Sequence, residues 1–77
     1  MWNTYCDGRY NYKTWGYFLD GKEAVSINTL VNNRYRVTIF NKKGKWQLQW
    51  FDDDIDVAKL KGLIRARDEG WDIEDVI

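Results

Sequence analysis

The sequence predicts an α+β fold: a four-stranded antiparallel meander with one C-terminal α-helix packed on one face. Three observations predict it: aromatic and β-branched segments separated by short Gly or Asn turns, an amphipathic segment with an acidic start and a glycine end, and the absence of proline. A chain of 77 residues is long enough for one domain. We expect strands over about 9–51, the helix over about 54–69, an irregular segment at 1–8, and a tail or short strand at 70–77.

The first hairpin is predicted from Asp20-Gly21, which separates an aromatic run from a run that contains Val and Ile. A two-residue type I′ turn needs residues that tolerate a positive φ, and Asp and Gly do. If Leu19 pairs with Lys22 and the strands alternate strictly, Trp15 and Tyr17 lie on the less apolar face. We therefore expect both rings on the side of the sheet that the helix leaves open.

The second hairpin is predicted around the turn Asn41-Lys42-Lys43-Gly44, with Phe40 paired with Lys45. This register aligns three large apolar pairs on one face: Tyr35 with Trp50, Val37 with Leu48, and Ile39 with Trp46. A slip of one residue would break all three pairs, so the register is strongly specified.

A three-residue loop, Val31-Asn32-Asn33, is predicted to join the two hairpins. It pairs Val25 with Ile39 and Ile27 with Val37, whereas a two-residue turn would place these residues on opposite faces. Asn accepts the left-handed conformation that such a loop needs.

The helix is predicted from its caps and its periodicity. Asp52-Asp53-Asp54 supplies an N-cap and negative charge at the positive end of the helix dipole, and Gly70 ends the helix. At 100° per residue the large apolar side chains form one narrow stripe, which we expect to contact the sheet: Val57, Leu60, Leu63 and Ile64.

Charge and composition limit the function. The chain has 12 basic and 12 acidic residues, but residues 1–50 carry a net charge of +5 and residues 51–77 a net charge of −5. The sequence has no apolar run long enough for a transmembrane helix and no signal-peptide pattern at its start, so we expect no membrane association. A single cysteine, Cys6, excludes an intrachain disulfide and favours a reducing cytoplasmic setting.

No residue pattern predicts catalysis or a cofactor. Asp52, Asp54 and Asp56 have the spacing of a calcium loop, but Val57 and Leu63 stand where that loop needs Gly and Glu. The chain contains no histidine to activate Cys6, and it lacks nucleotide-binding glycine motifs. We expect a non-enzymatic protein without a metal or cofactor.

Two surfaces are predicted to bind. The open sheet face is expected to combine cations, rings and amides: Lys13, Trp15, Tyr17, Arg34, Arg36, Phe40, Lys45, Gln47 and Gln49. Such a surface suits phosphates and bases or a protein interface, and a third interpretation has residues 1–8 or Trp71 covering its rings. The second surface is acidic and suits a basic groove on a nucleic-acid enzyme: Asp52, Asp53, Asp54 and Asp56.

The stretch from Tyr35 to Trp71 contains a strand, the Asn-Lys-Lys-Gly turn, a second strand, an acidic cap and a helix that ends in Glu69-Gly70-Trp71. In this layout, over about half of the chain, it resembles a family of small phage anti-CRISPR proteins that inhibit Cas9. In that family an acidic surface occupies the nuclease site for target DNA. The resemblance implies a phage-type inhibitor that acts by contact in the host cytoplasm.

A second resemblance is to the three-stranded-sheet DNA-binding domains of recombinases and plant transcription factors. It is carried by Arg34-Tyr35-Arg36-Val37, Gly44-Lys45-Trp46 and Phe51-Asp52-Asp53. Those domains read the major groove with the sheet, so this resemblance implies DNA contacts from Arg34, Arg36, Lys45, Gln47 and Gln49.

These observations predict a small phage or mobile-element binding protein that inhibits a host nucleic-acid-handling complex, with a host protein or nucleoprotein complex as partner. The alternative is a DNA-binding module that uses its basic, aromatic sheet face. An exposed edge strand is also a route to a homodimer.

Overall fold

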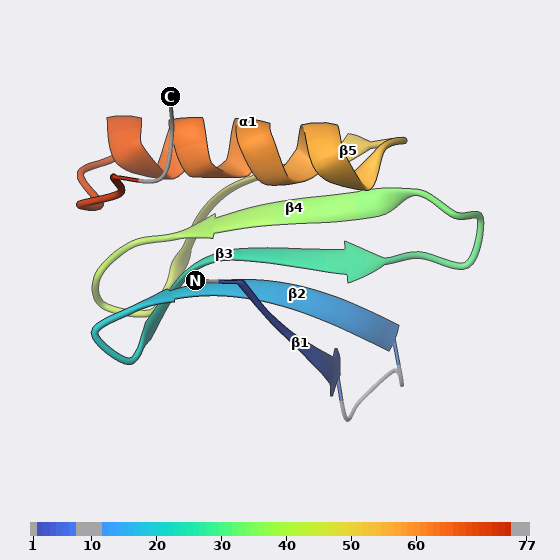
Figure 1. The fold of residues 1–77 in the computed structure, drawn as a ribbon, viewed down its shortest axis with the longest axis horizontal. Coiled ribbons are helices and arrows are strands. Elements are labelled where there is room, and N and C mark those ends of the chain that lie inside the picture. The colour runs from blue at the N-terminus through green and yellow to red at the C-terminus, as the bar shows by residue number, and fades with distance from the viewer. Residues whose placement is uncertain (1, 8–11, 75–77) are drawn as a thin grey trace.

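A computed structural model describes residues 2–7 and 12–74 of the chain, and it contains one antiparallel sheet and one helix (Figure 1). The strands follow one another in space as they do in sequence: β1 (Trp2–Asp7), β2 (Tyr12–Leu19), β3 (Lys22–Thr29), β4 (Tyr35–Phe40) and β5 (Trp46–Asp52). Helix α1 (Ile55–Asp68) follows and packs mainly against β3 and β4. The α+β class and the meander are confirmed, and the number of strands is five where we expected four.

The additional strand is β1, in a segment that we expected to be irregular. Trp2 pairs with Tyr17, and Thr4 pairs with Trp15 on the same face. The segment alternates, since Trp2 and Thr4 lie on one side and Tyr5 lies on the other. Residues 1 and 8 of the predicted irregular segment lie outside the described residues.

The turn at Asp20-Gly21 is confirmed, with positive φ values of 51° and 77°. Leu19 pairs with Lys22 as predicted, but the register then shifts, so that Tyr17 pairs with Val25 and Trp15 with Ile27. The expected open-face position of Trp15 and Tyr17 is therefore wrong. The physical reason is a β-bulge, which turns both rings onto the face that carries the apolar residues of β3.

The loop between β3 and β4 is confirmed, and so are the pairs of Val25 with Ile39 and of Ile27 with Val37. Its third residue, Asn33, has a φ of 61°. The Leu30 N–H donates to the Arg34 carbonyl over 2.8 Å and closes the loop.

The loop between β4 and β5 has the same construction. The Asn41 N–H donates to the Lys45 carbonyl over 2.8 Å, and Gly44 has a φ of 86°. The loop therefore has three residues where we expected four, and a second register shift follows it. The predicted pairs across this hairpin are wrong. Phe40 pairs with Trp46, one residue from its predicted partner, and beyond the shift the observed partners differ by two residues: Tyr35 with Asp52, Val37 with Trp50, and Ile39 with Leu48.

Both ends of α1 follow from sequence. The Asp54 side chain caps the helix by accepting hydrogen bonds from the N–H groups of Asp56 and Val57. At the other end Gly70 has a φ of 107°, and the Trp71 N–H donates to the Ala66 carbonyl over 3.1 Å. This is the Schellman arrangement, for which glycine is the favoured residue.

The face that α1 turns to the sheet differs from the predicted stripe. The seam consists mostly of small residues: Ala58, Gly62, Leu63 and Ala66. A Cβ on Gly62 would lie 2.9 Å from Val25 Cγ1, so the backbone of the helix lies very close to the sheet. Val57 and Leu60 are exposed because large side chains do not fit into this narrow seam.

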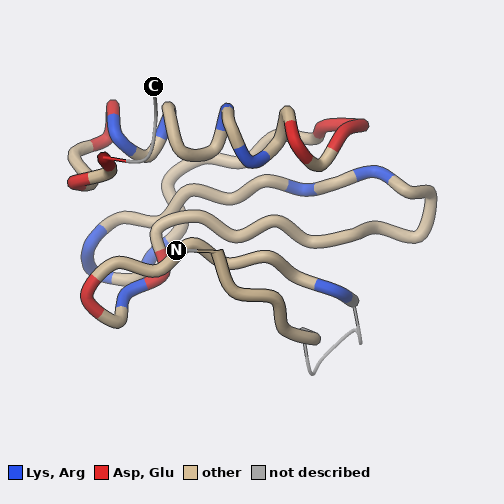
Figure 2. Tube along the Cα trace, viewed as in Figure 1, with Lys and Arg blue, Asp and Glu red and all other residues tan. Residues whose placement is uncertain are grey.

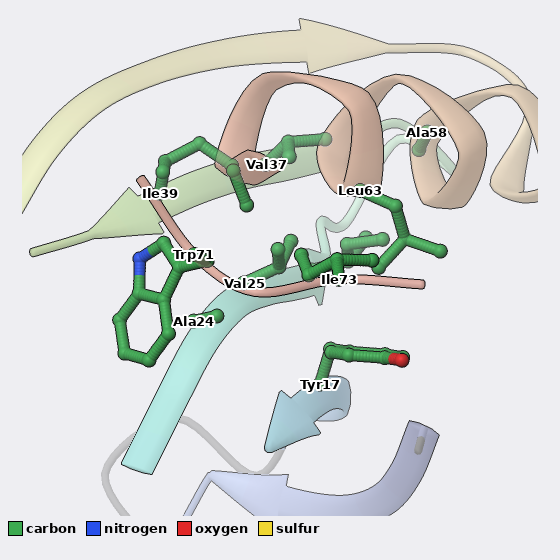
Figure 3. Packing of buried hydrophobic residues seen from close by; sticks show 11 residues of the cluster. Tyr17, Ala24, Val25, Val37, Ile39, Ala58, Leu63, Trp71 and Ile73 are labelled. Atoms are coloured by element: carbon green, nitrogen blue, oxygen red, sulfur yellow. The ribbon is translucent and has the colours of Figure 1, made fainter. Parts of the chain in front are cut away.

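The core lies between the sheet and α1 and is closed by the segment after the helix (Figure 3). Trp71 lies beside Ala24, and Ile73 lies beside Val25 above Tyr17. The Trp71 indole N–H donates to the Phe40 carbonyl over 2.7 Å. Residues 71–74 form no strand, while residues 75–77 lie outside the described part of the chain. No helix among the described residues is long and apolar enough to cross a membrane.

Candidate binding face of the sheet

The sheet has two faces, which we call the helix-side face and the open face. The open face lies opposite α1 and is built by alternate residues of all five strands. Its central residues are Tyr5, Thr14, Gly16, Ser26, Asn28, Arg36, Thr38, Gln49 and Phe51. Although no helix covers this face, Thr14, Ser26, Asn28 and Thr38 are buried.

Hydrogen bonds connect the buried polar residues across three strands. The Arg36 guanidinium donates to Asn28 Oδ1 over 3.2 Å, and Asn28 Nδ2 donates to Thr14 Oγ1 over 2.9 Å. Gln49 Nε2 donates to Thr38 Oγ1 over 3.1 Å. Because Asn28 uses both ends of its amide, it holds Arg36 in a defined position on the open face. Arg36 Nε is buried and has no hydrogen-bond partner among the described residues.

A second group of side chains lies over Gly16. A Cβ at this position would contact the side chains of Tyr5, Phe18 and Glu23, so a larger residue requires these side chains to move. The Tyr5 hydroxyl donates to Glu23 Oε2 over 2.7 Å. Burial raises the pKa of the Glu23 carboxyl above its ordinary value of 4.5, and the hydrogen bond from Tyr5 partly opposes this rise in pKa.

Aromatic rings border the polar centre. Phe51 pairs with Arg36 across β4 and β5, and its side chain is 53% exposed. The Arg34 guanidinium lies 5.7 Å from the centre of the Phe51 ring, and its Nε lies 2.9 Å from Asp53 Oδ1. Since this ion pair is exposed on both sides, it contributes little to stability. It does lower the net positive charge of this part of the face.

The structure brings together only part of the predicted sheet-face set. Arg36 and Gln49 lie on the open face as expected, and Arg34 lies beside the Phe51 ring of that face. Phe40 ends β4 two residues after Thr38, on the same face by alternation. Lys45 and Gln47 are exposed, Lys45 just before β5 and Gln47 near its start. The open face therefore has fewer cations and different rings than we predicted.

Lys13, Trp15 and Tyr17 are on the helix-side face, and their predicted place on the open face is wrong because of the bulge in the first hairpin. Tyr17 is only 3% exposed, and Trp2 packs edge-on against it with ring centres 5.2 Å apart. The Lys13 ammonium lies 5.0 Å from the Trp15 ring, and the Lys59 ammonium lies 5.8 Å from that ring. Of the two segments that we expected could cover these rings, residues 1–8 or the segment of Trp71, the first contributes Trp2, which packs against Tyr17.

The predicted acidic surface is divided among separate structural roles. Asp54 caps α1, Asp53 pairs with Arg34, and Asp52 accepts a hydrogen bond from the Trp50 indole over 3.0 Å. Asp56 is exposed in the first turn of α1. Figure 2 shows these carboxylates at the start of the helix, away from the lysines of the turn after β4. In the described ranges no three potential metal-binding side chains of His, Cys, Asp or Glu come together.

Sequence reasoning missed Tyr5 and Phe51 as rings of the open face. Tyr5 was missed because β1 was not predicted, although the alternation around it was visible. Phe51 could have been found from the alternation of β5, since it lies two residues after Gln49. Asn28 was expected on the less apolar face of the first hairpin, but its hydrogen bonds to Thr14 and Arg36 were not predicted. No protein-family model, no curated protein and no solved structure matches this chain.

Proposed function

We propose that this chain is a small non-enzymatic binding protein that inhibits a host nucleic-acid-handling complex by protein–protein contact, and that the open face is its contact surface. One observation carries the proposal: Arg36 is fixed by Asn28 at the centre of a polar surface, and the exposed ring of Phe51 lies beside it. Arginine and aromatic side chains are the residue types that dominate the energy of protein interfaces.

Preorganisation supports this use of the face. The polar centre is already hydrogen-bonded in the free protein, so a partner would not have to order it on binding. Tyr5 is 38% exposed and adds a second ring with a polar tip. The kind of partner rests on the resemblance of Tyr35–Trp71 to Cas9 inhibitors of phages.

The experiment measures DNA cleavage by a Cas9-type nuclease in the presence of increasing amounts of the protein. We expect inhibition, and we expect Arg36→Ala and Phe51→Ala to weaken it at least 10-fold, as substitutions at interface anchors do. Val31→Ala is the matched control, because Val31 is 85% exposed in the loop between β3 and β4 and belongs to neither strand. If the protein does not inhibit cleavage, the proposed partner is wrong. If all variants inhibit cleavage equally, the open face is not the contact surface.

DNA binding by the same face is the second candidate. Arg34, Arg36 and Gln49 lie together there, and each can contact a phosphate or a base. Duplex and single-stranded DNA are titrated at about 50 and 200 mM salt, between which a protein that uses several phosphates loses affinity steeply. Absence of binding at the lower salt concentration excludes this candidate.

A further inference from the structure

Helix α1 has a second apolar stripe, which points away from the sheet. Ala58, Gly62 and Ala66 occupy the side that faces the sheet. At 100° per residue Val57, Leu60 and Ile64 lie within about 60° of one another on the opposite side. Two of these side chains are large and exposed, Val57 at 40% and Leu60 at 53%. We call this set the outer stripe.

The outer stripe continues into a groove between α1 and the edge strand β5. The groove has a volume of about 430 Å³ and is lined by Leu48, Trp50, Lys61, Ile64, Arg65 and Asp68. Ile64 belongs to both features, so the stripe and the floor of the groove form one apolar surface. Such a continuous apolar surface is typical of a protein-interaction site.

The charges beside the outer stripe change sign along the helix. Asp56 lies near its start and Arg67 near its end, and both lie on the same flank of the stripe at 100° per residue. Among the described residues neither takes part in an ion pair. On the other flank the charged groups are already engaged within the chain, since Asp54 caps α1 and Arg65 pairs with Glu69 over 3.1 Å.

The order of these two charges is self-complementary: a second copy of α1 that runs in the opposite direction places its positive end beside the negative end of the first. In an antiparallel pair of identical helices related by a two-fold axis, each flank of one helix meets the same flank of the other. Asp56 then faces Arg67 of the second copy, and the reverse contact forms at the other end. The midpoint between Asp56 and Arg67 along the helix lies about one residue from the midpoint between Val57 and Ile64. A single alignment of the two helices therefore forms both the charged and the apolar contacts.

We propose that this chain forms a two-fold dimer through the outer stripe of α1, with the two helices antiparallel. The second copy is the occupant because the alternating charges and the apolar residues fit the same sequence in the opposite direction. The stripe points away from the sheet, so the two open faces of the dimer are directed outward and remain accessible. The inference does not depend on the proposed function.

The experiment is sedimentation velocity on the full chain between about 1 µM and 1 mM, because a small interface of this kind gives dissociation constants around the micromolar range. We expect a concentration-dependent dimer. Leu60→Asp should leave a monomer throughout, and circular dichroism shows whether that variant is folded. A wild-type chain that is monomeric at 1 mM overturns the proposal.

Charge exchange supplies a test that does not change the apolar surface. Asp56→Arg and Arg67→Asp should each raise the dissociation constant about 2- to 30-fold, since symmetry places two such surface pairs in the interface. The double variant should restore the wild-type value. Failure of the double variant to restore it overturns the antiparallel arrangement.

Pairing of two copies through the edge strand β5 is distinguished by one more variant. Gln47→Lys with Gln49→Lys places two like charges on that edge and should leave the helix-mediated dimer unchanged. A dimer that is lost in this variant but persists in Leu60→Asp assembles through the strand, and the proposal is then wrong.

Discussion

The two faces of the sheet exclude water by different means. On the helix-side face, Val25, Ile27, Val37 and Ile39 are fully buried beneath small residues of α1, and close packing of carbon atoms excludes water. On the open face no helix or strand of the described residues lies above the sheet. Thr14, Asn28 and Thr38 are nevertheless buried there, and their side chains take part in hydrogen bonds.

This difference has consequences for stability and for function. A packed apolar face tolerates little change in volume, since its neighbours are held by backbone on both sides. The open face carries hydrogen-bonded polar side chains with no helix of the described residues packed on them. A change in side-chain size is therefore expected to cost more stability on the helix-side face than on the open face.

The largest effect is expected where the two layers are closest. Gly62→Leu inserts a side chain where even a Cβ would lie 2.9 Å from Val25 Cγ1. We expect a loss of at least about 3 kcal/mol in the free energy of unfolding, or failure to fold, because α1 must move away from the sheet. Urea denaturation measures it, with Lys61→Leu on the exposed side of the helix as control. Equal stability of the two variants would mean that the seam is not closely packed.

The next effect concerns the polar network of the open face. Asn28→Ala removes the acceptor for Arg36 and the donor to Thr14, and we expect it to cost about 1–3 kcal/mol, as for buried polar groups that lose their partners. Gln49→Ala removes an amide that is exposed, so its cost should be smaller. If denaturation shows that Asn28→Ala and Gln49→Ala lose equal free energy of unfolding, the burial of Asn28 does not strengthen its hydrogen bonds.

The comparison of the faces also explains which predictions succeeded. Turns and caps are decided by a few neighbouring residues, so Asp20-Gly21, Asn33, Asp54 and Gly70 were found from sequence. The register between β3 and β4 was also found, because its alternatives would have placed Val25 on the polar face. In each case the competing arrangement had a clear local cost.

The two β-bulges were not predictable from local signals. Each bulge adds one residue to a strand without glycine or proline to mark it, and its position depends on matching distant side chains. A bulge near Ala24 is favoured only when the apolar pairs Tyr17 with Val25 and Trp15 with Ile27 are considered together. The placement of Trp15 and Tyr17 failed for this reason, whereas Arg34, Arg36 and Gln49 lie far from that bulge.

The helix was found but its orientation was not. Hydrophobicity selects the largest side chains, which are Val57, Leu60, Leu63 and Ile64, and of these Leu63 is buried in the seam. At the other seam positions the decisive property was small size, since Ala58, Gly62 and Ala66 are spaced four residues apart. Small residues at helical spacing were a signal in the sequence that a reading by hydrophobicity alone does not detect.

A smaller effect is expected at the second crowded glycine. In Gly16→Ala the new Cβ meets the ends of the Tyr5, Phe18 and Glu23 side chains, which can rotate away. Alanine also restricts the unfolded chain, which favours folding. We expect a net change within about 1 kcal/mol, much less than for Gly62→Leu, together with greater exposure of Tyr5. Denaturation measures the free energy of unfolding, and tyrosine fluorescence reports on the exposure of Tyr5. A loss of stability as large as that for Gly62→Leu would mean that the open face tolerates added volume no better than the helix-side face.

The smallest effect concerns the charge that the open face retains. Burial raises the pKa of Glu23 above its ordinary value of 4.5 in the folded state, so the folded protein binds more protons than the unfolded chain just above pH 4.5. The contribution of Glu23 to stability is therefore most favourable at low pH and declines as the pH rises through that window. Glu23→Gln keeps an oxygen acceptor for the Tyr5 hydroxyl and removes the charge.

We expect Glu23→Gln to be more stable than the wild type at pH 7, by up to about 0.5 kcal/mol, and equally stable near pH 4. Thermal unfolding of both proteins across this pH range measures the difference. Asp20→Asn is the control, because Asp20 is an exposed carboxylate in the neighbouring turn and its loss should not reproduce the same pH dependence. If Glu23→Gln is instead less stable than the wild type at pH 7, the hydrogen bond from Tyr5 to the charged carboxylate outweighs the effect of burial. The open face then stabilises negative charge.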